Sequence, residues 1–188
     1  MTAVTHPDAQ KWNQRFNEEG KAWLRSSPNQ FLVAVASYLP TSGLALDVAA
    51  GVGTNGLFLA KRGLHVIALD ISEVGLRLAK ELARSQQLRL ETAVIDLSSL
   101  WLPADYFDVI LNFRFLERST FPIYKRALKP GGWLVFETFV QGDTAVTHPQ
   151  YYLQPDELRR AFADLKIVHY RETRDRRKNV AQLLAQKP

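Results

Sequence analysis

The stretch DVAAGVGTNG, residues 47–56, combines an aspartate with three glycines spaced as G-x-G-x-x-G. Gly51 and Gly53 have the spacing of a sharp strand-to-helix turn that a ligand can approach, and Gly56 would let the next helix pack close to a sheet. Asp70 ends the next apolar run, where a carboxylate can accept hydrogen bonds from ribose hydroxyls. The glycine spacing is also compatible with a tight turn that binds nothing. Together with Asp70, it fits nicotinamide dehydrogenases equally well.

Two further carboxylates favour a cofactor other than a dinucleotide. Asp47 lies just before the glycines, where a phosphate would gain nothing from a negative charge, whereas a ligand with an ammonium group would use it. Asp96 follows the third apolar run and is placed to accept from an adenine amino group; its alternative role is that of a helix cap or turn residue. We also expect a chain of 188 residues to lack room for the separate substrate domain of many dehydrogenases.

Apolar runs that alternate with helical segments must position these residues. Continuously apolar strands separated by helices indicate a parallel sheet covered on both faces, with its ligand beyond the carboxyl ends of the strands. The last two runs are joined by the basic segment RETRDRRKN without a helix, so we expect a loop there and antiparallel pairing. The expected strands are 44–48, 65–70, 90–95, 107–112, 133–139, 166–170 and 179–184, and the expected helices are 54–62, one capped by Ser72, 123–128 with a stop at Pro130-Gly131-Gly132, and Pro155 to Phe162.

In order along the chain, these stretches resemble the motifs of class I S-adenosylmethionine-dependent methyltransferases, from about Phe31 to the C-terminus. LDVAAGVGTN resembles the first motif, VIALDIS the second, VIDLSSLWLPADYFDVIL the third and fourth, and ALKPGGWLVFET the fifth. The resemblance implies a single-domain, Rossmann-like α/β fold over residues 1–188, with a helical cap over 1–40 and a cofactor-binding core over 41–188. It implies a seven-stranded sheet of order 3-2-1-4-5-7-6 with the last strand antiparallel.

The implied activity is transfer of a methyl group from S-adenosylmethionine, by in-line displacement, to a small-molecule acceptor. Ala49 stands where the family has its first glycine; we expect its methyl group to be tolerated if the backbone there is not left-handed. By the resemblance, the methionine part of the cofactor would lie near the glycine turn, the ribose at Asp70 and the adenine at Asp96. The implied cofactor-binding residues are Asp47, Ala49, Gly51, Gly53, Asp70, Ile71, Asp96, Leu97, Asn112 and Phe113.

The N-terminal segment offers a possible cover for this site. Trp12, Phe16 and Trp23 precede the first strand among polar residues, so we do not expect them in the core. If residues 10–24 close as a lid, Arg15 would meet the cofactor carboxylate and Trp12 would shield the methionine arm. The alternative is an amphipathic helix packed permanently on the edge of the sheet.

The acceptor side is expected after the fourth and fifth strands. The candidates for contact with the substrate are Arg114, His148, Tyr151 and Tyr152. Arg114 would hold an anionic substrate, or else form a salt bridge with Glu117. The alternatives are a surface position for His148 and packing on the following helix for the tyrosines. We expect Glu137 and His169 to face solvent or a neighbouring helix, and we name no catalytic base, because an anionic acceptor needs none.

Composition narrows the remaining possibilities. The absence of cysteine excludes disulfides and thiolate chemistry, the four histidines lack metal-ligand spacing, and we expect no metal. No apolar run reaches membrane-spanning length and the first residues do not resemble a signal peptide, so we expect a cytoplasmic protein without membrane contact. We expect a monomer or weak homodimer. A net charge of +5 leaves open a methyltransferase for RNA or protein, and a non-catalytic adenosine-cofactor-binding protein is the other alternative.

Two features favour a small-molecule acceptor over nucleic acid. KWNQRFNEEGKAW and HPQYYLQPDELRRAF resemble segments of small-molecule and tellurite-resistance-type methyltransferases. In addition, Asn112 is followed by Phe-Arg-Phe and not by the Pro-Pro-aromatic pattern typical of enzymes that methylate nucleobase or glutamine amides.

Overall fold

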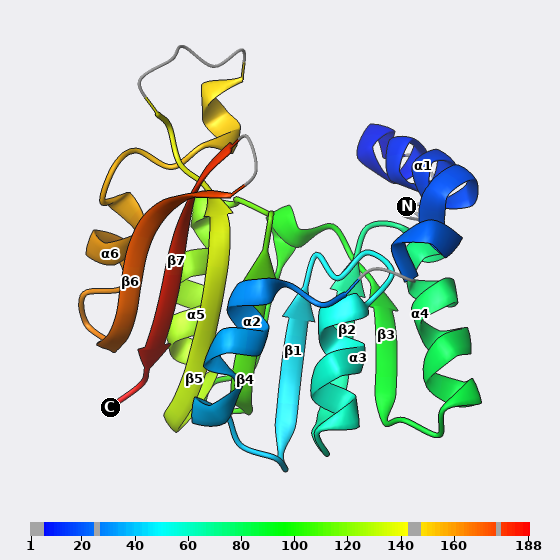
Figure 1. The fold of residues 1–188 in the computed structure, drawn as a ribbon, viewed down its shortest axis with the longest axis horizontal. Helices are drawn as coiled ribbons and strands as arrows, with labels where there is room; N and C mark the ends of the chain where they lie inside the picture. Colours follow the sequence, from blue (N-terminus) through cyan, green and yellow to red (C-terminus); the bar gives the residue numbers. More distant parts are fainter. Residues whose placement is uncertain (1–5, 25–26, 143–147, 176–177) are drawn as a thin grey trace.

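One mixed sheet organises the chain. The computed structural model describes residues 6–24, 27–142, 148–175 and 178–188, and the sheet has the strand order β3-β2-β1-β4-β5-β7-β6 (Figure 1). Strands β1 to β5 are parallel, and β7 runs antiparallel to both of its neighbours, which confirms the predicted order and direction. The strands are β1 Leu44–Val48, β2 His65–Asp70, β3 Leu90–Val94, β4 Phe107–Phe113, β5 Leu128–Phe139, β6 Lys166–Asp175 and β7 Lys178–Gln186.

Helices flank both faces of the sheet. In Figure 1, α2 and α3 lie in front of the strands, α5 lies behind them, and α1 stands beyond the carboxyl ends of β2 and β3, above α4. Among the described residues, no helix combines the length and apolarity needed to cross a membrane. The helices are α1 Pro7–Leu24, α2 Gln30–Val35, α3 Thr54–Lys61, α4 Glu73–Ser85, α5 Phe121–Ala127 and α6 Glu157–Ala161, with 3-10 turns η2 Ala36–Tyr38, η3 Leu97–Ser99, η4 Arg118–Thr120 and η5 Pro149–Tyr151.

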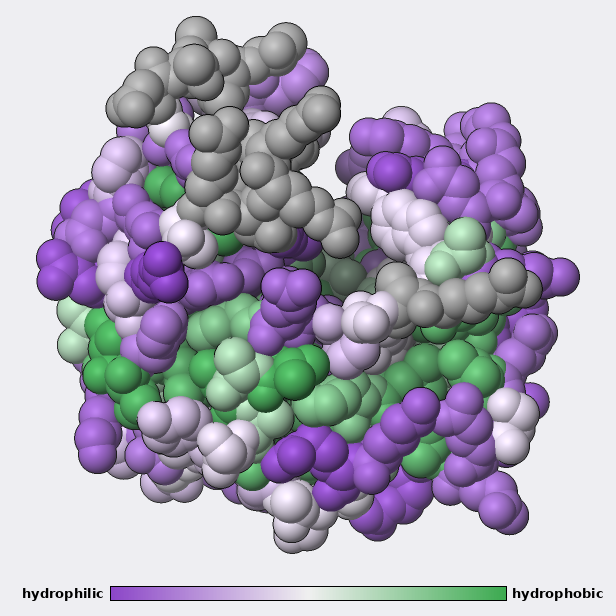
Figure 2. Space-filling model, viewed as in Figure 1, coloured by the Kyte–Doolittle hydropathy of each residue, from purple (hydrophilic) through white to green (hydrophobic). Residues whose placement is uncertain are grey.

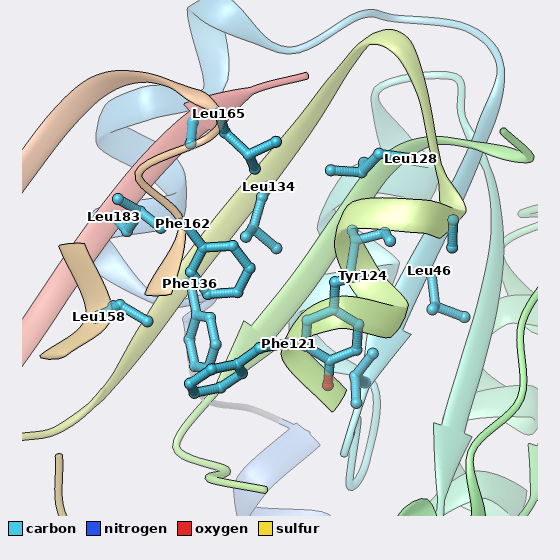
Figure 3. Packing of buried hydrophobic residues seen from close by; sticks show 14 of the residues in the cluster. Leu46, Phe121, Tyr124, Leu128, Leu134, Phe136, Leu158, Phe162, Leu165 and Leu183 are labelled. Atoms are coloured by element: carbon cyan, nitrogen blue, oxygen red, sulfur yellow. The ribbon is translucent and has the colours of Figure 1, made fainter. Parts of the chain in front are cut away.

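Alternation along the strands divides the core between the two faces. On one face, Phe136 packs edge-on against Phe121 and Tyr124 of α5, and Phe162 closes the same cluster (Figure 3). On the other face, Val135 and Leu184 join the cluster formed with α2, α3 and α4. Burial on both faces explains why these strands read as continuous apolar runs.

A predicted helix stop and a predicted loop lie within strands instead. β5 begins at Leu128 and continues through Pro130-Gly131-Gly132, which the sequence marks as a stop; Gly131 takes a left-handed φ of 78°, and its N–H donates to the carbonyl of Lys187. The basic segment expected as a loop extends the β6–β7 hairpin as far as Asp175 and Lys178, which pair with each other. Backbone pairing between strands therefore overrides the turn signal in β5 and the charge signal in the β6–β7 hairpin.

Candidate functional site

The turn after β1 is built from left-handed residues. Ala49, Gly51 and Gly53 have φ values of 53°, 57° and 73°. The two glycines were predicted to make a sharp turn and they do. Ala49 differs from the expectation, because its backbone is left-handed and its methyl group is therefore strained, at a cost of about 1–2 kcal/mol. A side chain at Gly53 would collide with Ala79 of α4, whose Cβ lies 2.7 Å from the position of the missing Cβ.

Asp70 ties the end of β2 to this turn. Its Oδ2 accepts from the N–H of Gly51 at 2.8 Å, and its Oδ1 accepts from the N–H of Ser72 at 2.8 Å. Burial raises the pKa of the carboxyl group, and these backbone donors oppose that effect. The two bonds use two of the roughly four acceptor positions of a carboxylate, so Asp70 retains capacity for hydroxyl donors.

Asp47 lies beneath the turn and is almost completely buried. Its Oδ2 accepts from the N–H of Gly56 at 2.8 Å, in the first turn of α3. Burial raises its pKa to about 7, and the nearby charge of Asp70 adds to this. A Cβ at Gly56 would lie 2.9 Å from that carboxylate oxygen and 3.1 Å from Val66, which confirms that glycine allows α3 to approach the sheet.

Asp96 and Leu97 lie one strand further along the same edge. The N–H of Ile95 donates to the carbonyl of Asp70. This bond places Asp96, the residue expected at the adenine, next to Asp70, the residue expected at the ribose. Asp96 Oδ1 accepts from the N–H of Ser98 and caps η3, and hydrogen bonds from Ser98 lower its pKa. Its side chain is 42% exposed, whereas Leu97 is buried in the core. The alternative role of Asp96 as a cap is thus observed, and its other oxygen, Oδ2, lies 3.9 Å from Nε2 of His6.

Asn112 and Phe113 end β4 with their side chains turned inward. The amide of Asn112 donates to the carbonyl of Phe115 at 2.9 Å and accepts from the hydroxyl of Tyr124 at 3.0 Å. Phe113 belongs to the core cluster on the opposite face. Any contact of Asn112 with a cofactor would consequently involve its backbone.

Helix α1 docks on α4 beside the glycine turn. Phe16 is only 3% exposed, so the expectation that it lies outside the core is wrong. Its ring faces two glycines, with Cζ 3.1 Å from a Cβ position at Gly51 and Cδ2 2.9 Å from one at Gly75. Asn13 adds a polar contact, because its Oδ1 accepts from the hydroxyl of Ser72 at 2.7 Å. The sequence signal that was missed is the pair of glycines that accommodates the ring.

The two α1 residues expected at the cofactor, Trp12 and Arg15, contact other residues of α1. Trp12 stacks on Phe16 with 5.6 Å between ring centroids. The guanidinium of Arg15 lies over the rings of Trp12 and Trp23, at 5.4 and 4.8 Å, and pairs with Glu19. The guanidinium of Arg15 thus has partners within its own helix. Ile71, also expected at the cofactor, follows Asp70 and is partly buried.

The predicted acceptor-side residues gather at the carboxyl ends of β4 and β5. Arg114 has a left-handed φ of 59°, and its guanidinium lies over the ring of Phe139 at 5.0 Å. Tyr152 contacts the same ring at 5.8 Å between centroids, and His148 lies 6.0 Å from the ring of Tyr151. A non-glycine residue in this backbone conformation at a strand end is typical of a functional site.

Arg114 pairs with Glu137 instead of Glu117. Its Nη2 lies 3.0 Å from Oε1 of Glu137, whereas Glu117 accepts from the N–H of Ser119 and caps η4. Glu137 is buried and contacts Asn29, the N-cap of α2, so it faces a neighbouring helix and not solvent, the second of the two expected positions. Its alternation with Trp133 and Val135, which face the covered side of β5, is the sequence signal for this burial.

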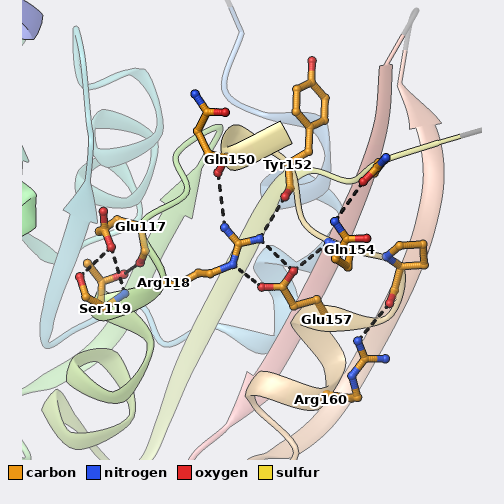
Figure 4. A network of polar contacts seen from close by, with 11 residues as sticks. Glu117, Arg118, Ser119, Gln150, Tyr152, Gln154, Glu157 and Arg160 are labelled. Atoms are coloured by element: carbon orange, nitrogen blue, oxygen red, sulfur yellow. Dashed lines mark hydrogen bonds and ion pairs between the residues drawn. The ribbon is translucent and has the colours of Figure 1, made fainter. Parts of the chain in front are cut away.

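Arg118 holds the segment that carries the two tyrosines. Its guanidinium makes a bidentate pair with Glu157, with distances of 2.6 and 2.9 Å, and donates to the carbonyls of Gln150 and Tyr152 (Figure 4). Glu157 also accepts from the N–H of Gln154. The connection after β5 is therefore fixed to the connection after β4.

The surface is hollowed beside α1, on the edge at which the parallel strands end (Figure 2). A separate cavity of about 560 Å³ opens further along that edge, between the ends of β5 and β6 and the start of β7. Its lining includes the amide side chains of Gln141, Gln154 and Asn179 and the carboxylate of Glu172. Within the described ranges, no group of three or more acidic or histidine side chains has the arrangement of a metal site.

Comparison with known proteins agrees with this geometry. Residues 45–132 match the family described as "Methyltransferase domain". Over 98 residues the chain is 37% identical to a ubiquinone biosynthesis O-methyltransferase from Coxiella burnetii, an alignment that covers 50% of this chain and 42% of that protein. The chain spans about half the length of the curated relatives it matches.

Two solved structures share the fold over almost the whole chain. TehB from Haemophilus influenzae superposes with a TM-score of 0.75 at 20% identity, over 94% of this chain and 67% of that one. The [4+2]-cyclase SpnF superposes with a TM-score of 0.76 at 17% identity, over 96% of both chains. Together with the sheet order, these likenesses show that the chain shares the fold of these proteins, and residues 45–132 resemble a methyltransferase domain.

Proposed function

We propose that this protein transfers the methyl group of S-adenosylmethionine to a small-molecule acceptor. The observation that carries the proposal is the junction of Asp70 with the left-handed glycine turn, with Asp47 beneath it and Asp96 on the neighbouring strand end. In this proposal Asp70 binds the ribose, Asp96 the adenine, and the turn the methionine part. The fold alone would not suffice, because one fold hosts unrelated activities.

The residues present fit this cofactor. Asp70 has acceptor positions for ribose hydroxyls, and the glycine turn brings backbone close to the space above it. Asp47 has a pKa near 7, so a cation held above the turn would favour its charged form. S-adenosylmethionine carries an ammonium and a sulfonium group, whereas a dinucleotide would bring phosphates to two buried carboxylates.

The chain's own contribution to the reaction would be alignment. S-adenosylmethionine supplies an already activated methyl group, and in-line placement of donor and acceptor is worth about 7–11 kcal/mol of the barrier. Arg114, Phe139 and Tyr152 line the side on which an acceptor would approach. An acceptor that is already ionised needs no general base, so none is assigned.

Two relatives support the class of acceptor. The curated matches include a ubiquinone biosynthesis O-methyltransferase and a demethylmenaquinone methyltransferase, both named for small-molecule chemistry. We propose an acceptor of comparable size, and a protein that works as a monomer or weak homodimer.

Calorimetry with S-adenosylmethionine, S-adenosylhomocysteine and NAD tests the cofactor. We expect micromolar binding of the first two and no binding of NAD. Conversion of S-adenosylmethionine to S-adenosylhomocysteine is then measured with catechol, 3,4-dihydroxybenzoate and selenite as acceptors. Binding of NAD without binding of S-adenosylmethionine would overturn the proposal.

A further inference from the structure

The buried carboxylate of Glu137 has no part in the function described so far. It lies on β5 opposite Gln182 of β7 and beside Phe113 of β4 in the sheet register. Its Oε1 accepts from the side-chain amide of Asn29 at 2.7 Å, and its Oε2 accepts from the amide of Gln182 at 2.7 Å. With Arg114 as third partner, it is the centre of a polar cluster inside an otherwise apolar face.

This cluster connects the acceptor side with the cofactor turn. Asn29 caps α2, and its backbone N–H donates to the side chain of Asn55 at 2.9 Å. Asn55 lies in the first turn of α3, two residues after Gly53. A continuous set of hydrogen bonds thus runs from the glycine turn, through Asn29 and Glu137, to Arg114.

The ion pair is oriented. The side chain of Glu137 is 3% exposed and that of Arg114 is 33% exposed, so the carboxylate faces the interior and the guanidinium faces the edge at which the strands end. The backbone N–H of Arg114 also donates to the carbonyl of Glu137 at 2.8 Å. Glu137 therefore contacts both the main chain and the side chain of Arg114, whose backbone is left-handed.

We propose that Glu137 is a positioning residue for the acceptor: it orients the Arg114 guanidinium, placed over Phe139, toward a planar acceptor that carries an anionic oxygen group. A guanidinium placed over an aromatic ring, as Arg114 is over Phe139, presents donors in the forked geometry that a carboxylate matches. This inference rests on the proposed function, since it assigns a substrate class to the same site. Because Glu137 acts through Arg114, its substitution by glutamine has two opposite predicted effects on binding of an anion. Loss of the negative charge alone would strengthen binding, whereas loss of the orientation of Arg114 would weaken it.

The test is binding of benzoate and of its neutral analogue benzamide to the S-adenosylhomocysteine complex, measured by calorimetry. We expect wild type to prefer benzoate, and Arg114→Gln to lose this preference. Glu137→Gln removes a negative charge next to the guanidinium. If Glu137 only neutralises Arg114, benzoate binding will tighten; if Glu137 positions Arg114, benzoate binding will weaken by about ten-fold, the value of a charged hydrogen bond.

Two further variants control for folding. Asp108→Asn removes a carboxylate paired with Lys129 at the other end of β4, so it should leave benzoate and cofactor binding unchanged. Gln182→Met removes one donor to Glu137 without touching Arg114, and it should weaken benzoate binding in the same direction if Glu137→Gln fails to fold. Unchanged or tighter benzoate binding in the Glu137 and Gln182 variants, or no preference in wild type, overturns the inference. Loss of S-adenosylhomocysteine binding by wild type would instead contradict the proposed function.

Discussion

The carboxylate of Asp70 accepts a hydrogen bond from the backbone N–H of Gly51, with 2.8 Å between the two atoms. This bond joins the end of β2 to the turn after β1. A second bond, from Ser72, fixes the other oxygen, so the carboxylate is both part of the turn and the proposed ligand of the ribose.

Asp70→Ala should weaken binding of S-adenosylhomocysteine by about 1.5–3 kcal/mol, because hydrogen bonds to a charged group are lost. The structure adds a cost to folding, since the N–H groups of Gly51 and Ser72 lose their acceptor. Calorimetry and urea denaturation measure the two effects separately. Unaltered cofactor binding would place the ribose elsewhere.

Ala49→Gly should stabilise the fold by about 1 kcal/mol, because glycine adopts a positive φ without strain. Ala50→Gly is the matched control: Ala50 is not among the residues with positive φ, so glycine there should destabilise by about 0.4–1 kcal/mol through the entropy of the unfolded chain. Urea denaturation of the two variants checks the opposite signs. Equal effects would show that strain at Ala49 has no energetic consequence.

The sequence predicts the sheet well, because apolar strands that alternate with helices leave few arrangements. The reversed β7, the cap at Ser72 and the close approach at Gly56 follow from local patterns, whereas the strand order was implied by the resemblance to a known family. Spacing also places Asp47 and Asp70 around one turn. Each of these features depends on neighbours in sequence or on the rules of parallel sheets.

The features that the sequence does not predict depend on partners far apart in the chain. Glu137 is buried because Asn29 and Gln182 reach it from 108 and 45 residues away. Phe16 is buried because Gly51 and Gly75 leave room for its ring. The residues next to Glu137 and Phe16 in the sequence do not indicate such distant contacts. The charge of Glu137 and the polar neighbours of Phe16 instead predict side chains exposed to solvent.

Stability should depend on the ionisation of Asp47. Its pKa is raised by burial from 3.8 to about 7 in the folded state, so the folded protein binds this proton more tightly than the unfolded chain does. The free energy of unfolding should therefore fall as pH rises from about 4 to about 7. Asp47→Asn retains an acceptor for Gly56 and removes the titration, so its difference from wild type should grow across this window. Parallel curves for the two proteins in urea denaturation would contradict the shift.

The docking of α1 bears on whether residues 10–24 form a lid. Phe16 packs against Gly51 and Gly75, and a Cβ at Gly20 would lie 2.5 Å from Leu78 of α4, so the two helices are in close contact. These contacts favour fixed structure over a segment that closes only on a bound cofactor. Phe16→Ala should then destabilise the protein by about 3 kcal/mol, as expected for a buried aromatic ring, whereas exposed Lys21→Ala should have little effect.

Hydrogen exchange separates a fixed helix from a lid. We expect the amides of Phe16 to Gly20 to be protected without ligand, and to gain little protection with S-adenosylhomocysteine, because the docking contacts exist without it. In that case Trp12 and Arg15 have a structural role, and Arg15 stabilises α1 through its contacts with Trp12, Trp23 and Glu19. Poor protection over residues 10–24 without ligand, followed by strong protection with S-adenosylhomocysteine, would show instead that α1 closes over the cofactor and that both residues belong to its site.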